Sequence, residues 1–87
     1  MITIWKYKVQ SVWTYLEVPV GGKILTRELQ NRVPHLWILV DSQAKKEVRV
    51  FQTVGTGNPL TPPIGTYIGT WQEDPFVWHL FETVPHA

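Results

Sequence analysis

Short runs in which apolar and polar residues alternate are the feature that most constrains the fold of this sequence. The run 2–9, for example, places Trp5, Tyr7 and Val9 on one side and its two lysines on the other. A period of two is that of a β-strand whose two faces meet different surroundings. The same pattern recurs at 12–18, 47–54, 66–72 and 76–84.

Two further segments need separate interpretation. The run HLWILVD, at 35–41, is almost continuously apolar, which favours a strand buried on both faces at the centre of a sheet. Segment 23–30 is ambiguous, because the spacing of Leu25 and Leu29 suits a helix whereas the β-branched Thr26 favours a strand. Gly69 interrupts a strand pattern and predicts a bulge or a close approach to the backbone.

The whole chain, residues 1–87, is therefore predicted to form one all-β domain. It should contain about seven short antiparallel strands joined mostly by loops of hairpin length. A sheet of that size does not stay flat in so short a chain. The strands are expected either to curl into a small meander barrel or to fold over as a sandwich.

Composition limits the function. The chain has eight Lys and Arg against seven Asp and Glu, so it lacks the basic excess of a duplex nucleic-acid binder. It has no cysteine and no histidine spacing typical of a metal site, so neither a metal nor a cofactor is expected. The absence of a signal peptide and of a long apolar run predicts no membrane segment and a cytoplasmic location.

The stretch VGTGNPLTPPIGTYIGTW, at 54–71, resembles a phosphate-binding loop at first sight. Its prolines forbid the helix that a dinucleotide fingerprint opens, and it lacks the lysine of a P-loop. Backbone N–H groups beside glycines can still form a concave nest for an anion. Such a nest would use Gly55, Thr56, Gly57 and Asn58, with the hydroxyl of Thr70 at its rim. The alternative is a hairpin loop stiffened by proline, in which glycines take positive φ.

Four side chains beyond this possible nest are further candidates for binding. Arg49 lies mid-strand, either as a cross-strand partner for a glutamate or as a bidentate grip on phosphate or carboxylate. Trp37 and Trp71 offer either core packing or a face on which a base stacks. His79 is either a packed strand residue or a hydrogen-bonding group in a pocket. No nucleophile and base, and no pair of carboxylates, is spaced for catalysis, so the protein is not expected to be an enzyme.

Several segments resemble a family of small uncharacterised proteins from bacteriophages and prophages. The shared motifs are I-x-K-Y at Ile4–Tyr7, P-x-G-x-K/R-I-L at Pro19–Leu25, L-W-x-L-V-D at Leu36–Asp41, G-T-G-x-P at Gly55–Pro59, Y-I-G-T at Tyr67–Thr70 and H-x-F-E at His79–Glu82. Where relatives commonly carry histidine before the proline, this chain has Asn58, which argues against a mechanism that needs an imidazole there. The resemblance implies a phage origin and a setting in the host cytoplasm, and brings no established activity.

The residues and the resemblance together favour a non-enzymatic binding protein that sequesters a small anionic, nucleotide-derived signal of host defence, with cyclic nucleotides among the candidates. The predicted ligand-binding residues are Trp37, Arg49, Gly55, Thr56, Gly57, Asn58, Thr70, Trp71 and His79. One alternative is a protein-interaction module that inhibits or redirects a host protein, and another is a minor structural or assembly protein of the virion. Aromatic residues on both faces of the first and last strands predict a homo-oligomer.

Overall fold

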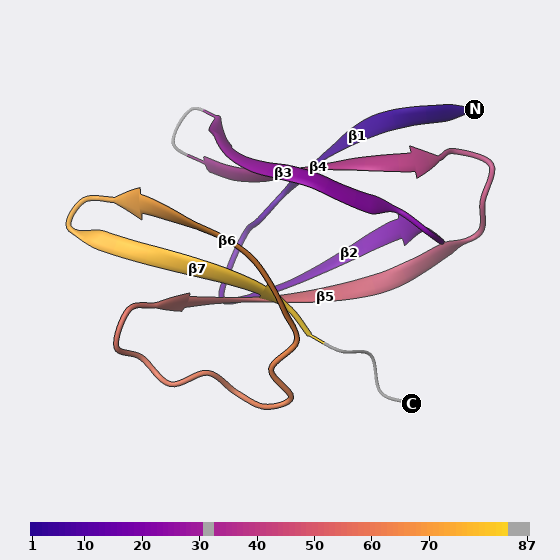
Figure 1. Ribbon diagram of the computed structural model, residues 1–87. Helices are drawn as coiled ribbons and strands as arrows, with labels where there is room; N and C mark the ends of the chain where they lie inside the picture. Colours follow the sequence, from indigo (N-terminus) through magenta and orange to yellow (C-terminus); the bar gives the residue numbers. More distant parts are fainter. Residues whose placement is uncertain (31–32, 84–87) are drawn as a thin grey trace.

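The computed structural model describes residues 1–30 and 33–83, and this part of the chain contains seven strands and no helix. The strands are β1 (Ile2–Lys8), β2 (Trp13–Pro19), β3 (Lys23–Gln30), β4 (Val33–Asp41), β5 (Lys46–Gly55), β6 (Thr66–Glu73) and β7 (Phe76–Glu82) (Figure 1). All of their pairings are antiparallel, so the predicted all-β class is confirmed. Within the described ranges, no helix is long and apolar enough to cross a membrane.

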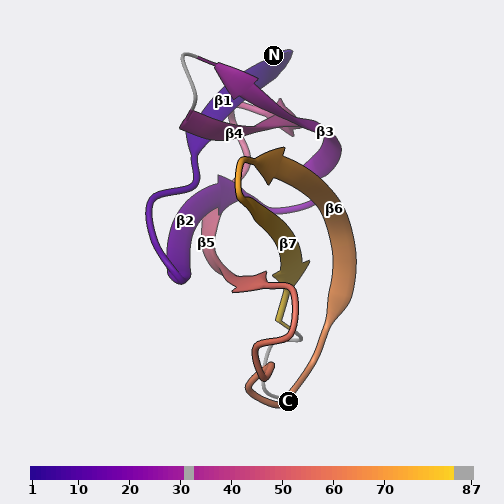
Figure 2. The same ribbon diagram turned by 90° about the vertical axis from the view of Figure 1, so that its left-hand side faces the viewer.

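The strands form two sheets, which we call sheet A and sheet B. Sheet A has the order β1-β4-β3, and sheet B has the order β2-β5-β7-β6. Figures 1 and 2 show sheet A lying over sheet B, with the two sheets not closed into a barrel. The fold is therefore a sandwich. Consecutive strands pair only in the hairpins β3–β4 and β6–β7, so a meander order holds for these two pairs and not for the whole chain.

The core lies between the two sheets and is built by the alternation seen in the sequence. Trp5 and Tyr7 of β1 point inward and are half-buried. Ile4, Lys6 and Lys8, which alternate with them, are exposed. Most of the fully buried side chains come from the middle strands of the two sheets, among them Leu36, Ile38, Phe51 and Leu80, and Val18 of the edge strand β2 joins them. Burying this apolar surface between two sheets is the main favourable term in folding such a chain.

Strand β4 is the centre of sheet A, as its apolar run predicts. The prediction that both of its faces are buried is wrong, because only one face meets sheet B. Leu36, Ile38 and Val40 are buried there, whereas Trp37 and Leu39 on the outer face are only half-buried. Sheet A therefore carries apolar side chains on a surface over which no second sheet of residues 1–30 and 33–83 lies.

Two irregularities occur where the sequence is ambiguous or carries a glycine. Segment 23–30 is a strand, and its register with β4 shifts between Ile24 and Thr26. The register of β6 with β7 shifts between Tyr67 and Gly69, which confirms the predicted bulge at Gly69. The run Asn31-Arg32-Val33-Pro34 favours a turn by its composition, but Val33 and Pro34 begin β4. Residues 31–32 and 84–87 lie outside the described residues.

The proline-rich loop that follows β5 folds back over the outer face of sheet B. Gln52 alternates with the inward-facing Phe51 and so points outward, yet it is only 3% exposed. Its side-chain amide donates to the carbonyl of Thr61 and accepts from the Thr61 N–H, at 3.1 and 2.9 Å. These two bonds hold the loop against the sheet, so the glycine turn at its start has a fixed position.

Candidate functional site

Arg49 lies on the inner face of β5, because it alternates with Val48 and Val50 and shares the face of Phe51. Its Nε and Nη2 atoms donate to the two carboxylate oxygens of Glu82, at 2.6 and 2.7 Å. Its Nη1 donates to the carbonyl oxygen of Gly22 at 2.6 Å. The side chains of Arg49 and Glu82 are 16% and 18% exposed. The hydrogen bonds that Arg49 donates to Glu82, more than any other cause, raise the pKa of Arg49 above its ordinary value.

A cleft opens beside this ion pair, between the edge strands β3 and β6 of the two sheets. We call it the Arg49 cleft; its volume is about 450 Å³. Lys23 and Thr26 line it from β3, Thr66 and Tyr67 line it from β6, and Arg49 and Glu82 lie in its wall. Among the described residues, the charged ones of the lining are Lys23, Arg49 and Glu82, which together carry one net positive charge.

The hydroxyl of Tyr7 lies near the same arginine, in the space between the sheets. It is buried and has no hydrogen-bond partner among the described residues. Burial raises the pKa of Tyr7, and the positive charge of Arg49 acts in the opposite direction. This hydroxyl is an unsatisfied polar group next to the charged pair.

The glycine turn spans Gly55 to Asn58. The N–H of Asn58 donates to the carbonyl of Gly55 at 3.0 Å, and Gly57 has φ 89°. A positive φ at the third position is the requirement of a type II turn, which explains the glycine. The N–H of Thr56 donates to the carbonyl of Val77 at 3.1 Å. Two amides that an anion nest would use, those of Thr56 and Asn58, therefore already donate within the protein.

The glycine turn faces an indole across a shallow hollow. Gly55, Thr56 and Asn58 line this hollow together with Phe76 and Trp78, and its volume is about 400 Å³. A Cβ atom on Gly55 would lie 3.3 Å from the ring of Trp78 and 3.0 Å from the Asn58 side chain. The glycine is thus required by close packing of the turn against the indole.

Three hydroxyls and one imidazole form a chain on the outer face of sheet B. The His79 ring has its Nε2 atom 2.7 Å from the Thr56 hydroxyl and its Nδ1 atom 2.9 Å from the Thr70 hydroxyl. The Thr70 hydroxyl lies 2.6 Å from the Tyr67 hydroxyl. His79 is therefore a hydrogen-bonded strand residue that ties β6, β7 and the glycine turn together.

The structure brings some of the predicted residues together and separates others. Thr56, Thr70 and His79 are joined by hydrogen bonds, and Gly55, Thr56 and Asn58 share the hollow. Arg49 lies on the opposite face of sheet B from His79, so it is not the charge partner of a group bound at the glycine turn.

The two predicted indoles lie apart from both groups. Trp71 is 8% exposed and belongs to the core. Trp37 lies on the outer face of sheet A, where the ammonium of Lys6 is 5.6 Å from its ring centroid.

Two residues that line the Arg49 cleft, Glu82 and Lys23, were not predicted as site residues from the sequence. The sequence does contain a signal for Glu82, because it is the only acidic residue of β7 and alternation places it on the same inward face as Leu80. Lys23 carries none: it begins β3 opposite the outward-facing Leu39, so the alternation along β3 does not predict that it lines a cleft between the sheets.

Fold and site together define the chain as a small all-β sandwich domain with a charged cleft between its edge strands. It belongs to the family described as a domain of unknown function, DUF7352, whose model matches residues 1–87. No curated protein and no solved structure matches the chain.

Proposed function

We propose that this protein is a non-enzymatic binding module that sequesters a small anionic molecule in the Arg49 cleft. The observation that supports it is the charge of that cleft. Lys23 of one sheet and Arg49 of the other lie in the walls of the same concave site. Pockets that hold small ligands usually enclose about 300–1,000 Å³, and the cleft, at about 450 Å³, falls within this range.

The ion pair holds the Arg49 guanidinium in one orientation, which favours binding of an anion. A guanidinium has five N–H donors; three of them donate to Glu82 and Gly22, and these bonds fix its plane. The other two can donate to a ligand without a change of rotamer. Since Glu82 cancels one positive charge, the cleft suits a ligand that carries a single negative charge, such as a phosphodiester or a carboxylate.

The ligand class that we propose is a nucleotide-derived signal of host defence, for which cyclic nucleotides are the first probes. The resemblance to phage and prophage proteins supports a phage origin and action in the host cytoplasm. Tyr67 and Ile68 line the cleft beside the charged groups and offer an apolar surface for a base. A protein of this kind would act by lowering the free concentration of the signal.

Lys23 is the residue through which this function is tested, because its side chain is exposed whereas Arg49 also supports the fold. Isothermal titration and thermal shift with cyclic and linear nucleotides are expected to detect binding. A ligand at 100 times its Kd stabilises the fold by about 2.7 kcal/mol. Lys23→Glu should abolish this stabilisation and keep the melting temperature of the free protein.

Lys45→Glu is the matched control, since it makes the same charge change at an exposed loop position outside the cleft. It should bind as the unmodified protein does. If no nucleotide binds, or if the two variants lose affinity equally, the Arg49 cleft is not the site.

We also propose that the protein forms a homo-oligomer through the outer face of sheet A. Ile2 and Ile4 are 66% and 52% exposed there, and Ile4 lies directly opposite the half-buried Leu39. The same exposure favours a second candidate function, a module that binds a host protein. Capture of one host protein by the immobilised chain, lost in an Ile4→Glu variant that still binds nucleotides, would support that alternative.

A further inference from the structure

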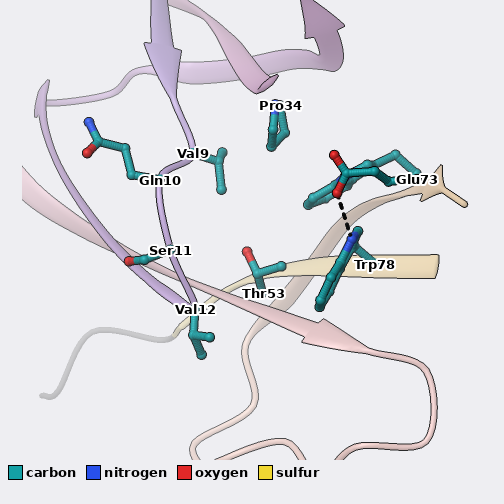
Figure 3. A pocket seen from close by; sticks show the side chains of 9 residues that line it. Val9, Gln10, Ser11, Val12, Pro34, Thr53, Glu73 and Trp78 are labelled. Carbon is teal, nitrogen blue, oxygen red and sulfur yellow. Dashed lines mark hydrogen bonds between the residues drawn. The ribbon is translucent and has the colours of Figure 1, made fainter. Parts of the chain in front are cut away.

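A second cavity lies at one end of the sandwich, away from the Arg49 cleft. We call it the end pocket; its volume is about 240 Å³. Figure 3 shows it between the segment that joins β1 to β2 and the hairpin β6–β7, with Thr53 of β5 in its middle. The residues that matter for its chemistry are Val9, Val12, Thr53, Trp71, Glu73 and Trp78. None of its lining residues lines the Arg49 cleft.

The hydroxyl of Thr53 is the polar group around which this pocket is built. It is buried and has no partner among the described residues. An unsatisfied buried hydroxyl carries an uncompensated desolvation cost, so its presence beside a cavity needs an explanation. Because the oxygen itself is closed to solvent, a ligand in the pocket reaches it once the Thr53 side chain rotates, and the hydrogen bond then removes that cost.

The walls of the pocket select a flat and uncharged molecule. Two indoles, those of Trp71 and Trp78, line it, and the indole N–H of Trp78 donates to the Glu73 carboxylate at 3.2 Å (Figure 3). Among the described residues, Glu73 is the only charged one that lines the pocket, and none of the lysines or arginines described there contributes to it. Beside this carboxylate an anion would lack a counter-charge, so the described lining favours an uncharged ligand.

The volume limits the ligand to one or two fused rings, because it is smaller than the 300–1,000 Å³ typical of sites for drug-sized molecules. We propose that the end pocket binds a neutral heteroaromatic ring of the nucleobase type. Its ring stacks on the indoles, and its edge hydrogen-bonds to the Thr53 hydroxyl. Stacking of a base on an aromatic side chain is sequence-tolerant because every base has a π-face.

Isothermal titration with adenine, cytosine and toluene tests this site. Adenine and cytosine are neutral rings that both donate and accept hydrogen bonds, whereas toluene is flat and does neither. The full chain should bind one molecule of at least one base and should bind toluene at least tenfold more weakly. Equal affinity for toluene, or no binding of either base, would overturn the proposal.

Two variants locate the bound base. Thr53→Val removes the hydroxyl at nearly constant shape, and it should weaken binding about tenfold without lowering the melting temperature. Val12→Trp should block the mouth of the pocket and abolish binding. Val48→Trp is its matched control, because Val12 and Val48 are each 58% exposed and Val48 does not line the pocket.

Base binding that survives both Thr53→Val and Val12→Trp would place the base elsewhere and overturn the assignment. The result is independent of the proposed anion site. Lys23→Glu should leave base binding unchanged, and Val12→Trp should leave nucleotide binding at the Arg49 cleft unchanged. The two sites can therefore fail separately.

Discussion

Arg49 and Glu82 meet through two parallel hydrogen bonds of 2.6 and 2.7 Å on the inner side of sheet B. The two residues belong to adjacent strands, β5 and β7, and are related diagonally, since Phe51 is the residue directly opposite Glu82. A third bond, from Arg49 to Gly22, connects the pair to the turn between β2 and β3. One partly buried guanidinium thus links β5, β7 and the turn through which the chain passes from sheet B to sheet A, and this gives Arg49 a structural role beside any role in binding.

Removal of the carboxylate charge should therefore destabilise the fold. In Glu82→Gln, Arg49 would keep its bond to Gly22 and would lose a charged partner in a setting that is only slightly exposed. We expect the free energy of unfolding to fall by about 1–3 kcal/mol, measured by urea denaturation. Glu17→Gln, at an exposed position of the neighbouring strand β2, is the control and should stay within about 0.5 kcal/mol. An unchanged midpoint in Glu82→Gln would show that the pair adds nothing to stability.

The two glycines of the β2–β3 turn are required for different reasons, and substitutions can separate them. A Cβ on Gly22 would lie 2.6 Å from a methyl group of the fully buried Val18, so Gly22→Ala should cost about 1–3 kcal/mol through overpacking. Gly21 has open space around it and φ 85°, so Gly21→Ala should cost about 1–2 kcal/mol through backbone strain alone.

Asparagine distinguishes the two causes, because it tolerates positive φ better than alanine does. Gly21→Asn should recover most of the lost stability in urea denaturation, whereas Gly22→Asn should be at least as unstable as Gly22→Ala. Equal stability of Gly21→Asn and Gly21→Ala would contradict the role of φ at Gly21.

The buried hydroxyl of Tyr7 should make stability fall at alkaline pH. Its pKa is raised by burial, so the native state holds this proton to higher pH than the unfolded chain does. The unfolded tyrosine ionises near pH 10, and above that pH the unfolded chain binds fewer protons than the native state. Stability from this group is then complete below about pH 10 and is lost as the pH rises further.

Tyr7→Phe isolates this effect. At pH 7 the variant should be as stable as the unmodified protein or more stable by about 1 kcal/mol, because an unpaired hydroxyl is removed. Between pH 9 and 11 its advantage in urea denaturation should grow. An advantage that stays constant over this range would mean that Tyr7 ionises equally in both states.

Much of the fold could be predicted from the sequence because the period of two survives in nearly every strand. It correctly placed Trp5 and Tyr7 on one face of the first strand, and of the two alternatives at Gly69 the structure shows an irregular register. Strand pairing could not be predicted, because β1 pairs with β4 and β2 with β5 across long separations that no local pattern encodes. The continuous run in β4 predicted burial on both faces, whereas one of its faces meets no second sheet.

The candidate site was predicted only in part, for the same reason. Thr56, Thr70 and His79 do meet, because the glycine turn closes over the β6–β7 hairpin that carries the other two. Arg49 does not join them, since alternation along β5 turns it to the inner face while His79 points outward. A sequence indicates which residues share a face of one strand, but not which faces of two sheets come together.

The outer face of sheet A should join two copies of the chain. The half-buried Trp37 and Leu39 lie at its centre, flanked by the exposed Ile2 and Ile4 of the edge strand β1. Contiguous apolar surface of this kind usually marks an interface.

Light scattering coupled to size exclusion should give at least twice the 10.1 kDa mass of the chain. Ile4→Glu should give the monomer, because association would bury a charge without a partner. Val48→Glu, on the other sheet and 58% exposed, should keep the oligomer. A 10.1 kDa particle for the unmodified protein at micromolar concentration would show that this face meets no second copy.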